Sequence, residues 1–229
     1  MSEPLQAFAD REALAEAASE LIAATLAKAL EARGRAALVA TGGTTPAPAY
    51  RRLSQAPLDW DKVAVTLSDE RWAAPTSPDS NERMVRETLL TGPAAAAHFV
   101  PLWSPAQDPE AAAHEADPDI RRLLPFDCVL LGMGDDGHIA SLFPGSPALE
   151  TGLDPGAHRL CIGVPAGEPA PPQPRISLTL PALLQGLVII LTSGEPKRRT
   201  LESALAGADL PVRRVLKQSR VPVRILWSP

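Results

Sequence analysis

The segment Phe126–Gly145, FDCVLLGMGDDGHIASLFPG, joins a strand pattern to a glycine-rich turn. Its first part, Phe126–Leu131, is largely apolar and is bounded by Pro125 and Gly132, which is typical of a strand covered on both faces. Ligands bind at the carboxyl ends of the strands in open α/β sheets. His138 lies just past this strand and is therefore a candidate for a functional site.

Apolar strand patterns alternate with helical patterns along the rest of the chain. Leu14 and Ile22 belong to a helical pattern that we expect to end near Gly34, and further helices are expected over Asp79–Leu90 and Gly194–Leu205. Strand patterns cover Ala36–Ala40, Lys62–Leu67, His98–Leu102, Phe126–Leu131, Arg159–Val164, Ile176–Leu180, Leu187–Thr192 and Val223–Trp227. This alternation predicts a three-layer α/β/α fold with a mainly parallel, open, Rossmann-like sheet.

Length and composition narrow the class of protein. The 229 residues suit one large α/β domain, so we expect a single domain over 1–229. The formal net charge of -5 gives no overall attraction for nucleic acid or an anionic membrane and favours a small-molecule partner. Cys128 and Cys161 lie in separate strand patterns, which fits a reducing compartment. Without a targeting segment or an apolar run of membrane-spanning length, we expect a cytoplasmic protein, a monomer or weak homodimer.

Gly132, Gly134 and Gly137 satisfy the G-x-G-x-x-G pattern of dinucleotide-binding proteins. Three observations argue against that cofactor. Asp135 and Asp136 place carboxylates where a pyrophosphate would lie, and the following helix has room for only about two turns before a Pro-Gly pair. An acid that would bind the ribose after the next strand is also missing. We therefore expect no dinucleotide cofactor.

We expect the three glycines instead to form a tight turn whose backbone N–H groups stabilise an oxyanion. His138 would act beside it, because an imidazole can take a proton from water near neutral pH; a purely structural histidine is the alternative. Asp136 would either hold the imidazole ring or only cap the following helix. Ser141 would share a helical face with His138, but the chain has no G-x-S-x-G elbow for a serine nucleophile.

A second glycine-rich turn, formed by Gly42, Gly43, Thr44 and Thr45, follows the strand pattern Ala36–Ala40. Converging backbone N–H groups and threonine hydroxyls favour a bound phosphate. The turn lacks the lysine of a P-loop, which argues against a nucleoside triphosphate. A capped turn without a ligand is the alternative.

Asp69, Glu70 and Arg71 follow the strand pattern Lys62–Leu67, at an end where ligands bind in such sheets. The guanidinium of Arg71 can bind phosphate as a planar fork. Asp69 and Glu70 would orient Arg71 or carry acid/base chemistry. An ordinary surface ion pair is the alternative for either acid.

Lys197 offers a point charge for a phosphate dianion, although solvated helix charge is the alternative reading of this basic segment. Arg175 is a weaker candidate for the same role. His98, His114 and His158 have no metal-ligand spacing, so we expect no metal site.

The segment Pro165–Pro174, PAGEPAPPQP, is the one compositionally biased stretch. Its proline content predicts an extended surface loop rather than a domain linker. We expect this loop to border the site.

In motifs that cover nearly its whole length, the chain resembles the 6-phosphogluconolactonases, within the sugar-phosphate superfamily that also holds the glucosamine-6-phosphate deaminases: ATGGTTP (40–46), LSDERW (67–72), GMGDDGHIASLFPG (132–145), RISLT (175–179) and GEPKRRTL (194–201). The resemblance implies hydrolysis of 6-phospho-D-glucono-1,5-lactone to 6-phospho-D-gluconate in the oxidative pentose phosphate pathway, without a metal or cofactor. By motif, His138 matches the family's catalytic histidine, and Arg71 and Lys197 match its phosphate-binding residues.

One position departs from the lactonase pattern, because Ile139 gives GHIA, as in the deaminases, where lactonases usually read GHTA. The deaminases continue with a Phe-Asn-Glu type of sequence whose acid helps to open the sugar ring. Here Ser141 and Leu142 occupy those positions, which favours the lactonase. A deaminase and a non-catalytic sugar-phosphate-binding regulator are the alternatives.

The implied mechanism uses one base. Neutral His138 would activate water for attack on the lactone carbonyl and then protonate the departing ring oxygen. Thr44, Thr45, Arg71 and Lys197 would hold the remote phosphate and supply binding energy and orientation.

Overall fold

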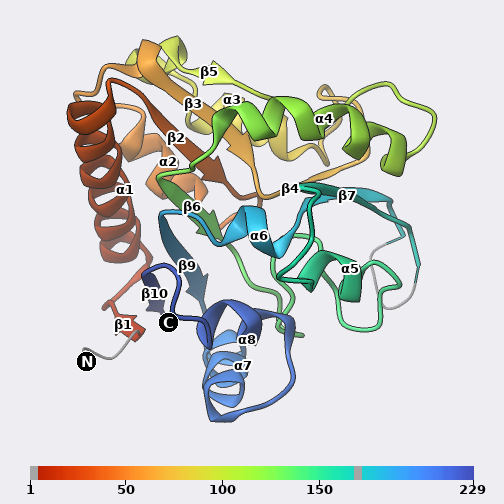
Figure 1. Cartoon of the computed structure of the whole chain (residues 1–229). Helices are drawn as coiled ribbons and strands as arrows, with labels where there is room; N and C mark the ends of the chain where they lie inside the picture. The colour runs from red at the N-terminus through yellow and green to blue at the C-terminus, as the bar shows by residue number, and fades with distance from the viewer. Residues whose placement is uncertain (1–4, 168–171) are drawn as a thin grey trace.

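The computed structural model describes residues 5–167 and 172–229, and in them a seven-stranded parallel sheet forms the centre of the molecule (Figure 1). The strand order is β1-β10-β9-β6-β2-β3-β5. The strands are β1 Leu5–Ala7, β2 Ala36–Ala40, β3 Val63–Leu67, β5 His98–Phe99, β6 Cys128–Leu131, β9 Leu187–Ser193 and β10 Val223–Ser228. The predicted α/β fold with a mainly parallel open sheet is confirmed.

Helices flank this sheet. The longest, α1, packs against α2 and along β2, β6, β9 and β10, whereas α7 follows β9 and packs against α8 (Figure 1). The helices are α1 Arg11–Arg33, α2 Ala47–Leu53, α3 Asn81–Thr88, α4 Pro109–Leu123, α5 Leu149–Leu153, α6 Leu180–Leu183, α7 Glu195–Ala206 and α8 Pro211–Leu216. The short 3₁₀ helices η1 Trp60–Lys62 and η2 Gly92–Ala96 precede β3 and β5. No helix in the described residues is long and apolar enough to cross a membrane.

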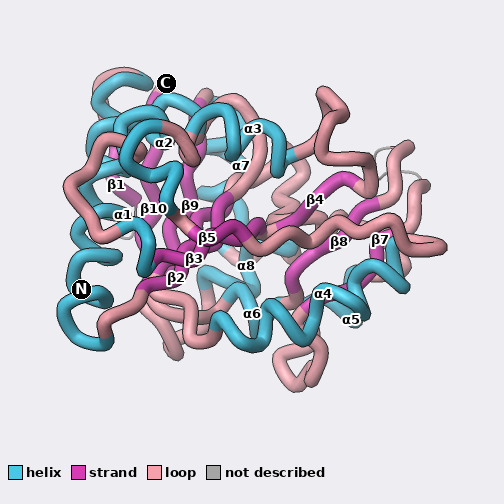
Figure 2. Tube along the Cα trace, turned by 90° about the horizontal axis from the view of Figure 1, so that it is seen from above, coloured by secondary structure: helices cyan, strands magenta, loops and turns pink. Residues whose placement is uncertain are grey.

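A second, three-stranded sheet lies to one side of the main sheet (Figure 2). It consists of β4 Asp69–Arg71, β8 Arg175–Leu178 and β7 Cys161–Val164, paired antiparallel in the order β4-β8-β7. Two of the expected strands therefore join this sheet rather than the parallel one. The correction has a simple cause, since an apolar run marks a strand but does not identify its partner.

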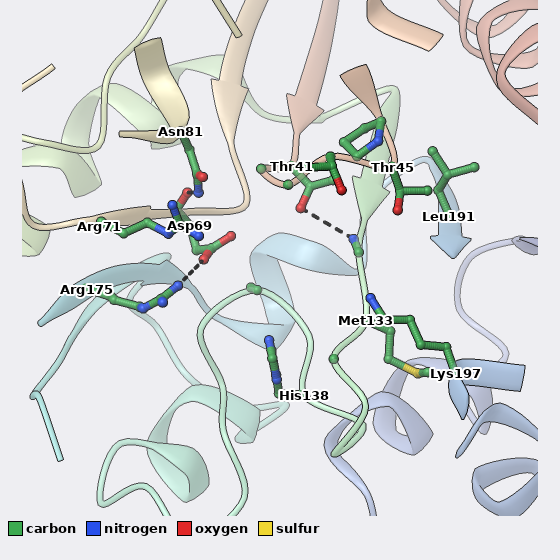
Figure 3. Close-up of a pocket in the computed structure, with 17 residues that line it drawn as sticks. Thr41, Thr45, Asp69, Arg71, Asn81, Met133, His138, Arg175, Leu191 and Lys197 are labelled. Atoms are coloured by element: carbon green, nitrogen blue, oxygen red, sulfur yellow. Dashed lines mark hydrogen bonds and ion pairs between the residues drawn. The ribbon is translucent and has the colours of Figure 1, made fainter. Parts of the chain in front are cut away.

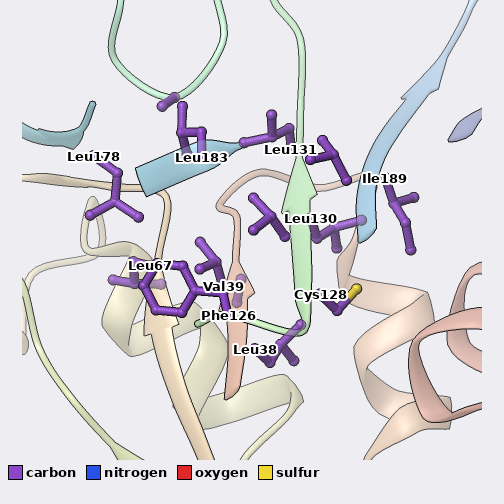
Figure 4. Close-up of a cluster of buried hydrophobic side chains, with 14 of the residues drawn as sticks. Leu38, Val39, Leu67, Phe126, Cys128, Leu130, Leu131, Leu178, Leu183 and Ile189 are labelled. Atoms are coloured by element: carbon purple, nitrogen blue, oxygen red, sulfur yellow. The ribbon is translucent and has the colours of Figure 1, made fainter. Parts of the chain in front are cut away.

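The core is continuous between the two sheets. Every residue of β6 is buried, and Leu130 packs among side chains of the neighbouring strands (Figure 4). Leu178 of β8 and Leu183 of α6 belong to the same cluster. Because Ser68 alone separates β3 from β4, the chain passes directly from the main sheet into the smaller one at the carboxyl end of β3.

Candidate functional site

A cavity of about 280 Å³ lies at the carboxyl ends of β2, β3, β6 and β9, beside the smaller sheet (Figure 3). It brings together most residues singled out in the sequence: Gly42, Gly43, Thr44, Thr45, Asp69, Arg71, Gly132, Gly134, His138, Arg175 and Lys197. Asp136 and Gly137 do not line the cavity. Six further residues line the cavity without having been predicted as site residues: Thr41, Pro46, Asn81, Met133, Ala140 and Leu191.

Asp136 holds both the ring and the backbone of His138. Its Oδ1 atom lies 2.6 Å from Nδ1 of the imidazole and accepts the backbone N–H of His138 at 3.1 Å. Burial acts to raise the pKa of Asp136, but the hydrogen bonds and charge of His138 outweigh it, so the pKa is lowered. An ionised carboxylate can only accept, which places the proton on Nδ1 and a lone pair on Nε2.

Gly134 leaves the space that the imidazole occupies. A Cβ atom at this position would lie 2.2 Å from both Cε1 and Nδ1 of His138. Such a distance is far shorter than van der Waals contact, so any side chain here would displace the ring. The glycine is therefore needed for close packing against the histidine.

The chain after the turn is not the short helix expected from the sequence. Ile139 instead makes isolated β-bridges with Met133 and Leu142, and Ala140 has a φ of 48°. Ser141 consequently does not share a helical face with His138. Its buried hydroxyl donates to Oδ2 of Asp69 at 2.6 Å.

The N–H groups of the three glycines that were expected to stabilise an oxyanion all face acceptors within the protein. The N–H of Gly134 donates to the carbonyl of His138, and the N–H of Gly137 donates to the carbonyl of Gly134, both at 3.0 Å. The N–H of Gly132 faces Oγ1 of Thr41 at 3.4 Å (Figure 3). The first two bonds close the turn on itself and the third contact joins it to the residue after β2, so the N–H groups of these three glycines are not free for a developing charge.

The loop Gly42–Thr45 presents free backbone donors. Its N–H groups donate to no acceptor in the described part of the chain. The hydroxyl of Tyr50 anchors the loop by accepting the N–H of Thr41 at 2.8 Å and donating to its carbonyl at 2.9 Å. Asn81 packs so closely on the loop that a Cβ on Gly42 would lie 1.9 Å from its Oδ1. The loop is thus fixed in a form that suits an anion.

Arg71 and Arg175 are opposite each other on β4 and β8. Like charges on directly opposite residues of two strands repel. The Nε atoms of both arginines are also buried without a hydrogen-bond partner in the described residues. Asp69 lies 3.7 Å from Arg175 and also accepts the hydroxyls of Ser68 and Ser141 (Figure 3). Burial lowers the pKa of Arg175, which Asp69 opposes. The pair favours an anionic ligand.

Glu70 has a structural role and not the catalytic one considered above. It is fully buried and accepts the N–H groups of Arg71, Asn81 and Glu82 as well as the hydroxyl of Ser80. Burial raises the pKa of Glu70 to about 7, although these four hydrogen bonds act to lower it. The carboxylate fixes the start of α3 and hence the Asn81 side chain at the cavity.

Lys197 of α7 lines the cavity on the side opposite Arg71 and Arg175 (Figure 3).

Residues 168–171 of the expected loop Pro165–Pro174 lie outside the described residues. On its carboxyl side, Gln173 donates to Oδ2 of Asp79 at 3.3 Å.

No group of three or more His, Cys, Asp or Glu side chains in the described ranges is arranged to hold a metal ion.

Comparisons with known proteins find relatives over nearly the whole chain. The family described as glucosamine-6-phosphate isomerases/6-phosphogluconolactonase matches residues 9–227. A 6-phosphogluconolactonase of Caulobacter vibrioides is 46% identical over 98% of this chain and 97% of that protein. One of Pseudomonas putida is 44% identical over 97% and 91%. The crystal structure of a 6-phosphogluconolactonase from Shewanella baltica superposes with a TM-score of 0.94 at 38% identity, covering 98% of this chain and 97% of that one.

Proposed function

The chain belongs to the glucosamine-6-phosphate isomerase/6-phosphogluconolactonase family, and we propose that it hydrolyses 6-phospho-D-glucono-1,5-lactone to 6-phospho-D-gluconate in the pentose phosphate pathway. The observation that carries the proposal is the 2.6 Å contact between His138 and Asp136 at the wall of a cavity that Lys197 also lines. A base and a cation in one cavity suit a substrate with a hydrolysable ester and a remote phosphate.

His138 activates the water. The Nε2 atom takes a proton from water while the water oxygen forms a bond to the lactone carbonyl carbon. Asp136 stabilises the resulting imidazolium through Nδ1–H. When the tetrahedral intermediate collapses, the bond to the ring oxygen breaks and Nε2 returns its proton to that oxygen. The free base is restored and the open-chain acid leaves.

Arg175 meets the charge that develops on the carbonyl oxygen. It lines the same cavity as His138, and its guanidinium lies over Phe143, whose ring is against the imidazole. A partly buried cation is well placed to stabilise an oxyanion, because the surrounding dielectric screens it less than water does.

The phosphate is held by the loop Gly42–Thr45 together with Lys197, with Arg71 as a second cation facing the cavity. The free N–H groups of the loop and the threonine hydroxyls supply directional donors, whereas lysine supplies charge. Binding energy from this remote group orients the lactone against His138.

The deaminase alternative fits the site less well. That chemistry needs an acid close to the ring oxygen, and in the Phe-Asn-Glu type of sequence the acid is the third residue after GHIA, where this chain has Phe143. Phe143 is buried and has no acidic group. A sugar-phosphate-binding regulator would keep the phosphate donors but would have no use for the His138–Asp136 pair.

The test is an assay with freshly generated 6-phosphogluconolactone at controlled pH, corrected for spontaneous hydrolysis, beside an assay of glucosamine-6-phosphate deamination. We expect saturable lactone hydrolysis and no ammonia release. Ammonia release would support the deaminase instead. Binding of 6-phosphogluconate without turnover of either substrate would support a regulator.

A further inference from the structure

Phe143 lies between the base and the neighbouring arginine. Its ring centroid is 4.3 Å from that of His138, at an interplanar angle of 46°, and the Cζ atom of Arg175 is 5.3 Å from the same phenyl ring centroid. The side chain is only 3% exposed. Aromatic pairs at this separation attract one another, and a guanidinium over a phenyl ring adds a cation–π interaction.

Asp136 alone does not fix the imidazole. One hydrogen bond to Nδ1 leaves the ring free to tilt about that contact, and His138 is 28% exposed. Gly134 and Phe143 limit the tilt, because both lie within contact of the ring. From this arrangement we propose that Phe143 is a positioning residue, which aims Nε2 of His138 at the lactone carbonyl. The inference rests on the proposed function.

The phenyl ring is itself held from the smaller sheet. Arg175 packs on it, Asp69 lies 3.7 Å from Arg175, and Ser141 donates to Asp69 at 2.6 Å. Ser141 and Phe143 belong to the segment that begins at His138, so these contacts connect that segment to β4 and β8 at two points. Ala140, whose positive φ costs free energy, directly precedes the first of these points.

Phe143 does not line the cavity, whereas His138 and Arg175 do. The phenyl ring should therefore act on the orientation of the base and not on substrate binding. A misplacement of the base by about 1 Å can cost roughly 100-fold in rate. Loss of the ring should accordingly lower kcat and leave KM largely unchanged.

The experiment compares Phe143→Leu with Phe143→Tyr, which keeps an aromatic ring, and with Phe99→Leu as a matched control. Phe99 also carries an arginine over its ring, with Cζ of Arg86 4.7 Å from the centroid, but lies on β5 away from the cavity lining. We expect Phe143→Leu to lower kcat about 10- to 100-fold with KM within about twofold of wild type. Phe143→Tyr should recover most of kcat, and Phe99→Leu should leave both constants unchanged.

A spectroscopic readout separates positioning from loss of folding. The chain has four histidines, so His138→Ala identifies the His138 ring signals in NMR spectra. Phe143→Leu should shift these signals through loss of the ring current and broaden the Nδ1 proton, with the other histidines unchanged. Unchanged His138 signals, or equal loss of kcat in the Leu and Tyr variants, would overturn the proposal.

The outcome for Phe143 is separable from that for the proposed function. If the wild-type protein does not hydrolyse the lactone, or His138→Ala keeps its turnover, the proposed function fails whatever Phe143 does. If His138→Ala is inactive but Phe143→Leu retains normal kcat, the proposed function stands and the positioning role is wrong.

Discussion

The Oδ1 atom of Asp136 accepts two hydrogen bonds from His138, one from the ring at 2.6 Å and one from the backbone at 3.1 Å. The two residues are separated only by Gly137, so a tight turn brings a carboxylate under the imidazole without help from a distant strand. The sequence left open whether Asp136 holds the ring or only caps the following helix. In the described residues no helix directly follows this turn, and the carboxylate contacts both the ring and the backbone N–H of His138.

Asp136→Asn should strongly reduce turnover. The amide of asparagine can donate to Nδ1, which favours the tautomer with its proton on Nε2, and that tautomer cannot accept a proton from water. We expect kcat to fall by about 100-fold or more, since general-base catalysis typically contributes that much. Asp135→Asn is the matched control, and steady-state kinetics of both variants is the measurement. Equal activity of the two variants would argue against a role for the carboxylate.

The lowered pKa of Asp136 also predicts a pH dependence of stability. A carboxyl whose folded-state pKa lies below its ordinary value of 3.8 stabilises the fold above that pH and loses this contribution as pH falls through the folded pKa. The advantage of wild type over Asp136→Asn in urea midpoint should therefore shrink as the pH falls below 3.8. An advantage that grows over that pH range would contradict the sign.

Gly134→Ala should inactivate the protein by displacing the imidazole, because its Cβ would lie 2.2 Å from two ring atoms. We expect kcat to fall by about 100-fold with a much smaller effect on KM. Gly156→Ala is the control, since its Cβ would meet Asp154 at an ordinary 3.4 Å. Circular dichroism would establish that both variants fold.

Lys197→Ala and Arg71→Ala should chiefly raise KM. Loss of a cation at a phosphate weakens binding, and we expect a rise of about 10- to 100-fold, as for charge-assisted hydrogen bonds generally. Arg199→Ala, at an exposed position on the same helix as Lys197, is the control. The decisive comparison uses δ-gluconolactone without phosphate, for which Lys197→Ala should be no worse than wild type. An equal defect on both lactones would exclude a phosphate role.

The parallel strands were predictable because β2, β6 and β9 are buried on both faces and therefore read as unbroken apolar runs. β4 was missed, since its residues Asp69–Arg71 carry no apolar signal and pair only through the backbone of β8. β1, Leu5–Ala7, is too short to show a period.

The candidate residues were predictable as a group because carboxyl ends of parallel strands meet at one edge. The individual roles of these residues were harder to predict. The glycine spacing did not reveal that the N–H groups of the three glycines have acceptors within the protein. The short helix expected after the turn is absent from the described chain, because Ile139 bridges to Met133 and Leu142. Asn81 gave only a helix-start signal, and its packing on Gly42 depends on tertiary contacts.

The central claim is that His138 is the base that activates water. The most direct test is the kcat of His138→Ala on freshly generated 6-phosphogluconolactone, with binding of 6-phosphogluconate measured in parallel. We predict a loss of kcat of about 100- to 10,000-fold with binding nearly unchanged. Turnover within about threefold of wild type, far less than the loss expected when a general base is removed, would contradict the account.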